Sequence, residues 1–433
     1  MRTPRKSLVS ECGWPGPACL LRARVVRACL VCAYLACFSC DQKDRSNPLD
    51  PGNPETHGSP PGFTAVALDR SVALRWEPLH LERLVGLNLY RRQAGSQSFE
   101  LLMGSPFPAQ SGAAVDSAVT NGVTYEYQLV PLVRDCAEGI PSPVRQATPG
   151  PDFAVVSDGC EGLVRKLSAD MRAGVWTAGG FFYPLSVAAA AGMVWLADPY
   201  SGVYCLTEEG ALLWKDPDPA VPFTVAARQD GLCAIADASP PAVRVLSADG
   251  SPVFSISEEL QRPSCVAFDA EGHLWLADRG AGFVRKYSSD GTLLASFTGC
   301  VEPSLLDADV LENACWVGDV STGELIKLDS DAAELLRVTL SGTMSVVEAD
   351  RATGGCWVAD ATEDFVARVS SDGRVLFRIG KLGGPVSLFA AESGKTWVLG
   401  ATEARLSVLS AQGELLSAVE SGQCPTSVVV LSR

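Results

Sequence analysis

Residues 274–291 read LWLADRGAGFVRKYSSDG, and closely similar stretches occur three more times in the chain. They are VWLADPYSGVYCLTEEG from residue 194, CWVGDVSTGELIKLDSDA from 315 and CWVADATEDFVARVSSDG from 356. Each copy places an apolar run directly before an Asp, and a polar, acidic turn follows further on. A stretch that recurs with its spacing intact predicts a repeated structural unit.

The Asp of this stretch defines a period close to 40 residues. Successive copies are separated by 40, 39, 41, 41, 41 and 40 residues. The seven positions are Asp158, Asp198, Asp237, Asp278, Asp319, Asp360 and Gly400. A Trp stands three residues earlier in five of the seven units, and a Pro begins an apolar run in six. Landmarks in phase at this period predict propeller blades of four short strands each.

The two ends of the repeat region complete one another. It opens at FAVVSDGCEGLVRKLSADM, which lacks a first strand, and it finishes with PTSVVVLSR (425–433), a first strand without the rest. Pairing the two removes the free sheet edges. The chain is therefore predicted to be all-β, with a seven-bladed β-propeller over 150–433 that is closed by the C-terminal strand. Each recurrent Trp is expected to pack between neighbouring sheets, because a single blade is unstable alone.

The pattern P-x-x-VA-x-D-x-x-G-x-LW-x-AD resembles the NHL-type propellers over about 280 residues. The virginiamycin B lyase family is a seven-bladed relative, and the gluconolactonase-like enzymes are more distant. The resemblance implies the fold, which hosts many unrelated activities. Lyase relatives use a His with acidic partners and a divalent metal, but His273 is the only His of the repeat region. It is expected on the rim opposite the Asp loops, so we predict no catalytic residue, metal site or cofactor.

Residues 60–148 contain short alternating runs separated by turn residues, which is typical of an all-β sandwich. Pro61-Gly62 precedes the first run, Trp76 ends VALRW, and GVTYEYQLVPL (122–132) follows later. These features resemble a fibronectin type III domain, in which Tyr125 would be the corner tyrosine. Such a domain is expected to space or position its neighbour.

Residues 1–40 are predicted to be a signal peptide of the lipoprotein kind. Basic residues up to Arg27 precede the apolar run ACLVCAYLACFSC (28–40), which is too short to span a bilayer. The run resembles that of a bacterial lipoprotein, with Cys40 as the lipidated residue and Cys37 as a competing site. The polar residues 41–59 are expected to form a disordered tether. Plain secretion and an uncleaved anchor remain as alternatives.

Composition restricts the partners. The chain of 433 residues carries a net charge of −15, and its first 40 residues hold six basic and one acidic side chain. The remainder is therefore near −20, which repels phosphate backbones and argues against nucleic acid. Nine Cys follow residue 40 without any CxxC pair, and most lie in apolar runs, where Cys behaves as a small hydrophobe. Their disulfide pairing stays open.

The recurrent Asp residues are interpreted as loop braces. Six carboxylates on one rim could gather a cation, but Gly400 breaks the ring. A Gly stands four residues after the Asp in several units, which favours an Asp that accepts backbone N–H groups in a tight loop. The divergent loops are better candidates for contact, and from them we predict Tyr200, Arg244 and Arg279 as ligand-binding residues.

Together these features predict a cell-envelope protein, lipid-anchored on the periplasmic or outer surface, that binds a protein or glycan through the propeller loops or acts as a scaffold. The rival hypothesis is a metal-assisted lyase or lactonase of the propeller type. A convergent His, Glu and Asp cluster at the central channel would favour that rival. A third alternative is a structural repeat protein that acts through avidity within an assembly.

Overall fold

The computed structural model describes residues 47–134, 137–216, 220–340 and 343–432. The predicted signal peptide, with Cys37 and Cys40, lies outside the described residues, as do residues 41–46 of the predicted tether. Every regular element that is described is a β-strand, which confirms the all-β class. Within the same ranges no helix has the length and apolar character needed to cross a bilayer.

Residues 47–59 differ from the disordered tether that was expected. They form consecutive turns in which the buried Asn53 side chain accepts the N–H groups of Glu55 and Thr56, at 2.9 and 3.2 Å. Leu49 packs against the core of the next domain. Asn, Pro and Gly are turn formers as well as residues of disordered segments, so composition alone did not separate the two outcomes.

The N-terminal unit consists of two antiparallel sheets. The first sheet has the order β1–β2–β5, formed by Thr64–Leu68, Ser71–Arg75 and Ala113–Asp116. The second has the order β4–β3–β6–β7 with β8 also paired to β6, formed by Glu100–Leu101, Leu84–Gln93, Tyr125–Val133, Ala137–Glu138 and Arg145–Ala147. Their facing side chains form one core around Trp76, Leu89 and Tyr127.

From residue 152 the described residues form seven four-stranded antiparallel sheets. The first contains β9 (Asp152–Asp158), β10 (Leu163–Leu167), β11 (Gly174–Gly179) and β36 (Pro425–Ser432). The next three contain β12–β15 (Ser186–Ala190, Met193–Asp198, Gly202–Thr207, Leu212–Lys215), β16–β19 (Pro222–Ala227, Cys233–Ala238, Pro241–Leu246, Pro252–Ile256) and β20–β23 (Pro263–Phe268, Leu274–Asp278, Phe283–Tyr287, Leu293–Phe297). The last three contain β24–β27 (Pro303–Asp309, Ala314–Asp319, Glu324–Leu328, Glu334–Thr339), β28–β31 (Val346–Ala349, Cys356–Asp360, Phe365–Val369, Val375–Gly380) and β32–β35 (Pro385–Ala390, Thr396–Gly400, Arg405–Leu409, Leu415–Glu420).

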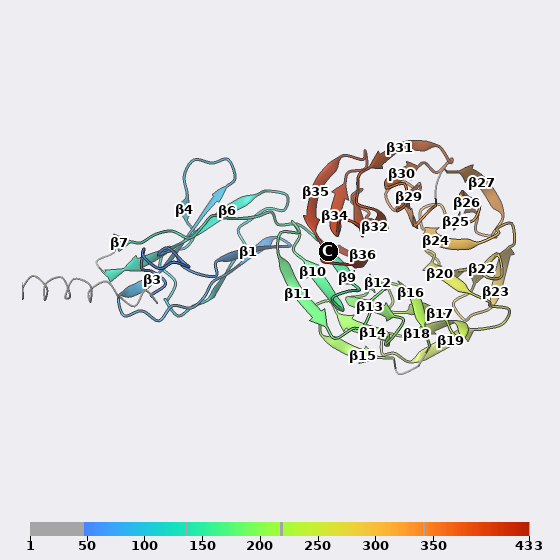
Figure 1. Ribbon diagram of the computed structural model, residues 1–433, viewed down its shortest axis with the longest axis horizontal. Coiled ribbons are helices and arrows are strands. Elements are labelled where there is room, and N and C mark those ends of the chain that lie inside the picture. The colour runs from blue at the N-terminus through green and yellow to red at the C-terminus, as the bar shows by residue number, and fades with distance from the viewer. Residues whose placement is uncertain (1–46, 135–136, 217–219, 341–342, 433) are drawn as a thin grey trace, which may run out of the picture.

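These sheets are arranged in a ring, which is the layout of a β-propeller (Figure 1). In the last six sheets the first strand lies toward the centre, in the first sheet β36 takes that place, and fourth strands such as β15, β23 and β31 lie on the circumference. These innermost strands contact their neighbours around the centre. The propeller expected from the 40-residue period is therefore confirmed.

The C-terminal strand β36 pairs with β9, so the first and last parts of the repeat region share one sheet. Its register places Val428 opposite Val156 and Leu431 opposite Phe153. A disulfide between Cys160 and Cys424, whose Cα atoms are 5.3 Å apart, joins the same two segments across 264 residues of sequence. The sequence had left this pairing open.

The recurrent Trp residues pack between sheets, as expected. Trp275 on β21 lies in one cluster with Val317 and Ile326 of the next sheet, and its side chain is fully buried. Cys205, Cys233, Cys315 and Cys356 are buried free thiols within the same kind of cluster. Cys therefore serves mainly as a small apolar side chain in these strands.

The N-terminal unit abuts the first propeller sheet (Figure 1). The backbone N–H groups of Gly150 and Ala169 donate to the carbonyls of Leu68 and Ala67, both at 3.1 Å. The N–H of Thr148 donates to the Asp170 carboxylate at 3.0 Å. These three hydrogen bonds connect the two units directly.

Candidate binding face on the loop rim

We call one side of the propeller the loop rim. It comprises the loops between second and third strands and the connections from each fourth strand to the next sheet. The recurrent Asp residues end the second strands there and are fully or almost fully buried. The opposite side, which carries the turns between first and second and between third and fourth strands, is called the turn rim.

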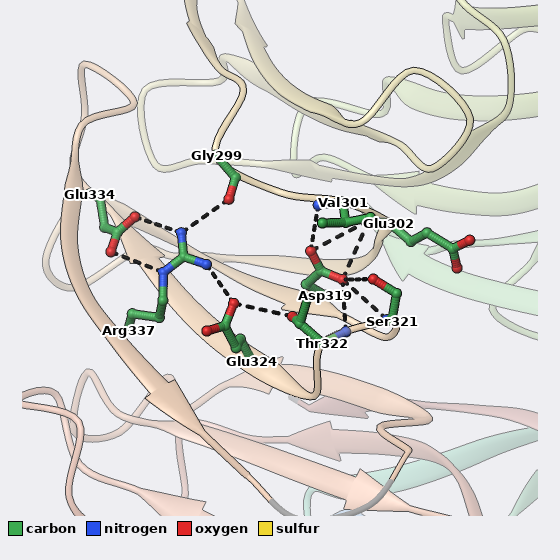
Figure 2. A network of polar contacts seen from close by, with 9 residues as sticks. All are labelled: Gly299, Val301, Glu302, Asp319, Ser321, Thr322, Glu324, Glu334 and Arg337. Carbon is green, nitrogen blue, oxygen red and sulfur yellow. Dashed lines mark hydrogen bonds and ion pairs between the residues drawn. The ribbon is translucent and has the colours of Figure 1, made fainter.

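Asp319 shows how a recurrent Asp works (Figure 2). Its carboxylate accepts the N–H groups of Val301 and Glu302 from the incoming connection, at 2.6 and 3.3 Å. It also accepts the N–H and hydroxyl of Ser321 and the N–H of Thr322 from its own loop. Burial alone would raise the pKa of Asp319, but these hydrogen bonds hold it below the ordinary value.

The same bracing recurs around the rim, which supports the interpretation of these residues as loop braces. Asp158, Asp198 and Asp278 likewise accept N–H groups from both their own loop and the connection beside it. Gly282 and Gly323 adopt φ values of 72° and 70° in the loops that follow. A left-handed residue at that place explains the Gly four residues after the Asp.

Asp198 holds three aromatic side chains on the surface. It accepts the N–H groups of Phe182, Tyr183 and Tyr200 at 2.6, 3.0 and 3.0 Å. The rings of Phe182 and Tyr183 lie 5.2 and 6.3 Å from the ring of Tyr200. Phe182 and Tyr200 are 71% and 72% exposed, and Tyr183 is 37% exposed. We call these three residues the aromatic trio.

The trio is specific to one place on the rim. Among the seven loops after the second strands, Tyr200 is the only aromatic residue, and among the seven connections only residues 181–183 are aromatic. Residues 181–183 connect the first sheet to the second, and Tyr200 lies in a loop of the second sheet, so the two aromatic segments are neighbours. Tyr183 also lies against Gly159, where an added Cβ would come within 2.5 Å of the ring. Tyr200 was predicted from the sequence, whereas Phe182 and Tyr183 were not; their signal in the sequence is the run GFFYP (180–184).

Arg244 and Arg279, the other predicted contact residues, have different surroundings. The Arg244 guanidinium binds Asp237, with Nε 2.6 Å from Oδ2, and also pairs with Asp216, so its side chain is only 14% exposed. It is a brace for the third sheet rather than a surface contact, and the prediction for Arg244 is not supported. Arg279 pairs with Glu302 at 2.9 Å and remains partly exposed. The structure places the three predicted residues on three different sheets.

His273 lies on the turn rim, as the strand order implied. Its Nδ1 is 3.3 Å from Asp269 Oδ2, and Glu271 is close enough to complete a group of potential ligand atoms within 4.8 Å. The same Asp269 oxygen lies 2.8 Å from the buried ammonium of Lys286. That positive charge competes directly with a cation, so this donor set does not fit a divalent metal.

The central channel contains an ionic cluster that was not predicted from the sequence. First strands line a cavity of about 270 Å³, into which Asp307 and Glu348 project with Arg351. Arg351 lies 2.5 Å from Glu348 Oε1 and 3.6 Å from Asp307 Oδ2. Burial raises the pKa of Glu348 to about 7 and also raises that of Asp307. The guanidinium between the two carboxylates makes this set, too, unsuited to a divalent metal.

Aligning the units would have revealed this cluster. Asp307 and Glu348 are the cross-strand partners of Trp316 and Trp357. The partners of Trp195, Trp275 and Trp397 are Ala188, Ala267 and Phe389, so this position is apolar in those sheets. Two neighbouring sheets therefore carry acids where other sheets carry apolar side chains.

No known protein family matches the chain, and no curated protein matches it either. Similar solved structures exist. A functionally unknown protein from Desulfotomaculum acetoxidans is 13% identical, with a TM-score of 0.56 over 65% of this chain and 99% of the other. A protein from Lactobacillus plantarum is 14% identical, with a TM-score of 0.55 over the same shares.

A virginiamycin B lyase from Staphylococcus aureus is also similar, at 12% identity and a TM-score of 0.49 over 55% of this chain and 83% of that enzyme. That score is too low to carry an argument about activity. At identities of this size, the likenesses show the propeller fold alone.

Proposed function

We propose that the chain is an exported, lipid-anchored binding or scaffold protein that recognises a protein or glycan through the loop rim, with the aromatic trio as its contact. The single observation that carries this proposal is the meeting of Phe182, Tyr183 and Tyr200 on the surface. Exposed aromatic side chains provide large contact areas at low cost in conformational entropy.

The repeat itself supports a functional role for the trio. Each unit occupies an equivalent position between its neighbours, so residues needed only for the fold should recur in every unit. The Asp brace recurs because each unit has this same structural requirement. Aromatic residues that occur in only one loop and one connection are not required by the repeated fold. Large exposed apolar groups lower solubility, so their presence on the surface favours a role in binding.

We propose that the seven sheets are the blades of one closed propeller, supported by the β36–β9 pairing. We also propose that the N-terminal unit is fibronectin type III-like, supported by its two-sheet core around Trp76. Tyr125 accepts the N–H of Thr120 at 3.1 Å, the contact expected of a corner tyrosine.

Export and anchoring rest on the leader, with Cys40 as the lipidated residue and Cys37 as the alternative. The Cys160–Cys424 disulfide supports export, because stable disulfides belong to oxidising compartments. A propeller held at the envelope in this way would present its loop rim to protein or glycan ligands there.

The alternative is a propeller lyase or lactonase, favoured by the buried Asp307 and Glu348 in the central channel. The channel-lining residues that are described include no His. Hydrolysis or elimination assays with Glu348→Gln test this alternative. Turnover by the wild type that this variant loses would replace the binding proposal.

Binding of the full chain to arrays of glycans and of envelope-protein peptides tests the proposal. Tyr200→Ala and Phe182→Ala should each weaken binding of the selected ligand by at least about tenfold, as interface hot spots do. Phe223→Ala is the matched control, because Phe223 is an exposed aromatic residue outside the trio. Unchanged binding in both trio variants would contradict the proposal.

A further inference from the structure

A crevice between the N-terminal unit and the propeller gathers three arginines. It has a volume of about 570 Å³. We call it the arginine crevice, and its polar lining consists of Thr64, Arg92, Glu126, Arg145, Gln146 and Arg172. Arg92 and Arg145 belong to β3 and β8, whereas Arg172 belongs to the turn between β10 and β11. Both units therefore contribute to the lining.

A chain of contacts holds these side chains in place. Arg92 Nε donates to one Glu126 oxygen at 2.5 Å, and Gln146 donates to the other at 2.8 Å. Arg172 Nη1 in turn donates to the Gln146 carbonyl oxygen at 2.7 Å. Hydrogen bonds from Gln146 and Arg92 lower the pKa of Glu126, so its carboxylate stays ionised. The arginines are thus positioned before any ligand arrives, which favours binding.

The terminal nitrogens of these arginines remain available. Arg145 uses Nε for the Phe63 carbonyl at 2.9 Å, and Arg92 uses Nε for Glu126. Both Nη groups of Arg92 and Arg145, and Nη2 of Arg172, make no hydrogen bond to the described residues. Guanidinium N–H groups at adjacent positions match the two oxygens of a carboxylate.

The charge of the crevice is opposite to that of the protein. Three guanidinium groups face one carboxylate, whereas residues after 40 carry a net charge near −20. Many arginines elsewhere are held by acids, as in the pairs Arg337–Glu334 and Arg368–Asp350. Within the described ranges Arg145 and Arg172 have no such ion pair. Distant acidic charges are screened beyond about 8 Å at physiological salt, so the local positive charge governs binding.

The turn that carries Arg172 departs from the repeat. It closes with a hydrogen bond from Ser168 N to Ala173 O, spanning five positions. The corresponding turns of the other sheets close over four positions, as in Ser288 N to Thr292 O. The first sheet therefore has one extra residue in the turn that faces the N-terminal unit. This extra residue places a cation in the crevice that no other unit has.

We propose that the arginine crevice binds a uronic-acid saccharide, whose carboxylate is received by the guanidinium groups of Arg145 and Arg172. Thr64 and Gln146 offer polar partners for sugar hydroxyls, and the volume suits a small organic ligand rather than an ion alone. A peptide strand is disfavoured, because the β1 carbonyl of Ala67 and the adjacent carbonyl of Phe63 are already taken by Ala169 N and Arg145 Nε.

Titration calorimetry of the purified full-length protein with an oligogalacturonate trisaccharide tests the proposal. Its methyl ester, inorganic sulfate and a Glu-rich peptide are the comparison ligands. We expect binding of the trisaccharide that weakens with added salt, and no binding of the uncharged ester. Equal or tighter binding of sulfate or of the peptide would overturn the assignment to a saccharide.

Variants assign the binding to the crevice. Arg172→Ala and Arg145→Ala should each weaken trisaccharide binding about tenfold, which corresponds to a charge-assisted hydrogen bond. Arg83→Ala, an exposed arginine of the same unit, is the control and should change nothing.

The melting temperature of Arg145→Ala and trisaccharide binding by Tyr200→Ala serve as two further measurements. Arg145→Ala also breaks the Phe63 contact, so if its melting temperature falls, Arg172→Ala alone decides the question. Unchanged binding in Arg172→Ala would overturn the proposal. Tyr200→Ala should leave trisaccharide binding intact, which separates this crevice from the loop-rim function.

Discussion

The two rims of the propeller are built from the same units but differ in what the units share. On the turn rim, backbone hydrogen bonds such as Ser288 N to Thr292 O and Ser370 N to Arg374 O close most turns in the same way. On the loop rim the shared element is a buried side chain, and the residues that point outward vary from unit to unit. Shared residues therefore maintain the fold, and we look for function where one unit departs from the others.

The largest effect is expected where a covalent bond supplements the bracing of the loop rim. Replacing Cys160 and Cys424 together by Ser should lower the free energy of unfolding by about 4 kcal/mol, because the disulfide closes a very long loop. Urea unfolding measures the loss. Cys300→Ser, which alters a free thiol, is the control. A loss below about 1 kcal/mol would mean that the β36–β9 pairing alone closes the ring.

The next prediction separates bracing from recognition. Asp198→Ala and Asp319→Ala should each lower the free energy of unfolding by about 3 kcal/mol, because several buried N–H groups lose their acceptor. Only Asp198→Ala should also abolish loop-rim binding, since Asp198 positions the aromatic trio. Chemical denaturation and binding assays on the same samples measure both. Equal loss of binding in Asp319→Ala would contradict the assignment.

A smaller effect is expected from pH through the channel. The pKa of Glu348 is about 7 in the folded protein, above its ordinary value of 4.5, so the folded state binds this proton more tightly. Between pH 4.5 and 7 this group should therefore lower the free energy of unfolding, by about 2 kcal/mol in total, as pH rises. Asp307 and Arg351 share the cavity and contribute to the same titration.

Glu348→Gln removes that titration. The difference in unfolding free energy between wild type and variant should favour the wild type less as pH rises through this window. Urea unfolding at pH 5, 6 and 7 measures it. A difference that stays constant across the three values would show that Glu348 titrates normally.

The smallest effect distinguishes the two predicted arginines. Arg244→Ala should cost about 2 kcal/mol, because it strips buried carboxylates of their partner. Arg279→Ala should cost no more than about 0.5 kcal/mol, because its ion pair with Glu302 is partly exposed. Thermal melting of both variants suffices. Similar melting temperatures would remove the distinction between brace and surface residue.

Local patterns predicted some residues of the candidate site but not others. Tyr200 stood out because a loop of one unit differed from its copies. Arg244 stood out for the same reason, yet its charge is used inside the third sheet by Asp237. The side chain of a residue in or just after a loop can lie in solvent or pair with a buried acid, and the residue type alone does not distinguish these two positions.

The sequence by itself determined the repeat, the class and the propeller layout, because a 40-residue period with fixed landmarks admits few ways to bury apolar faces. It also predicted the Asp braces, because the turn after the Asp, with a Gly in several units, marks one part of their partners in the sequence itself. Tertiary structure alone decided the Cys160–Cys424 bond, the channel cluster and the arginine crevice. Each of these joins residues that lie in different units or domains, and no local pattern records which distant segments the closed ring and the domain junction bring together.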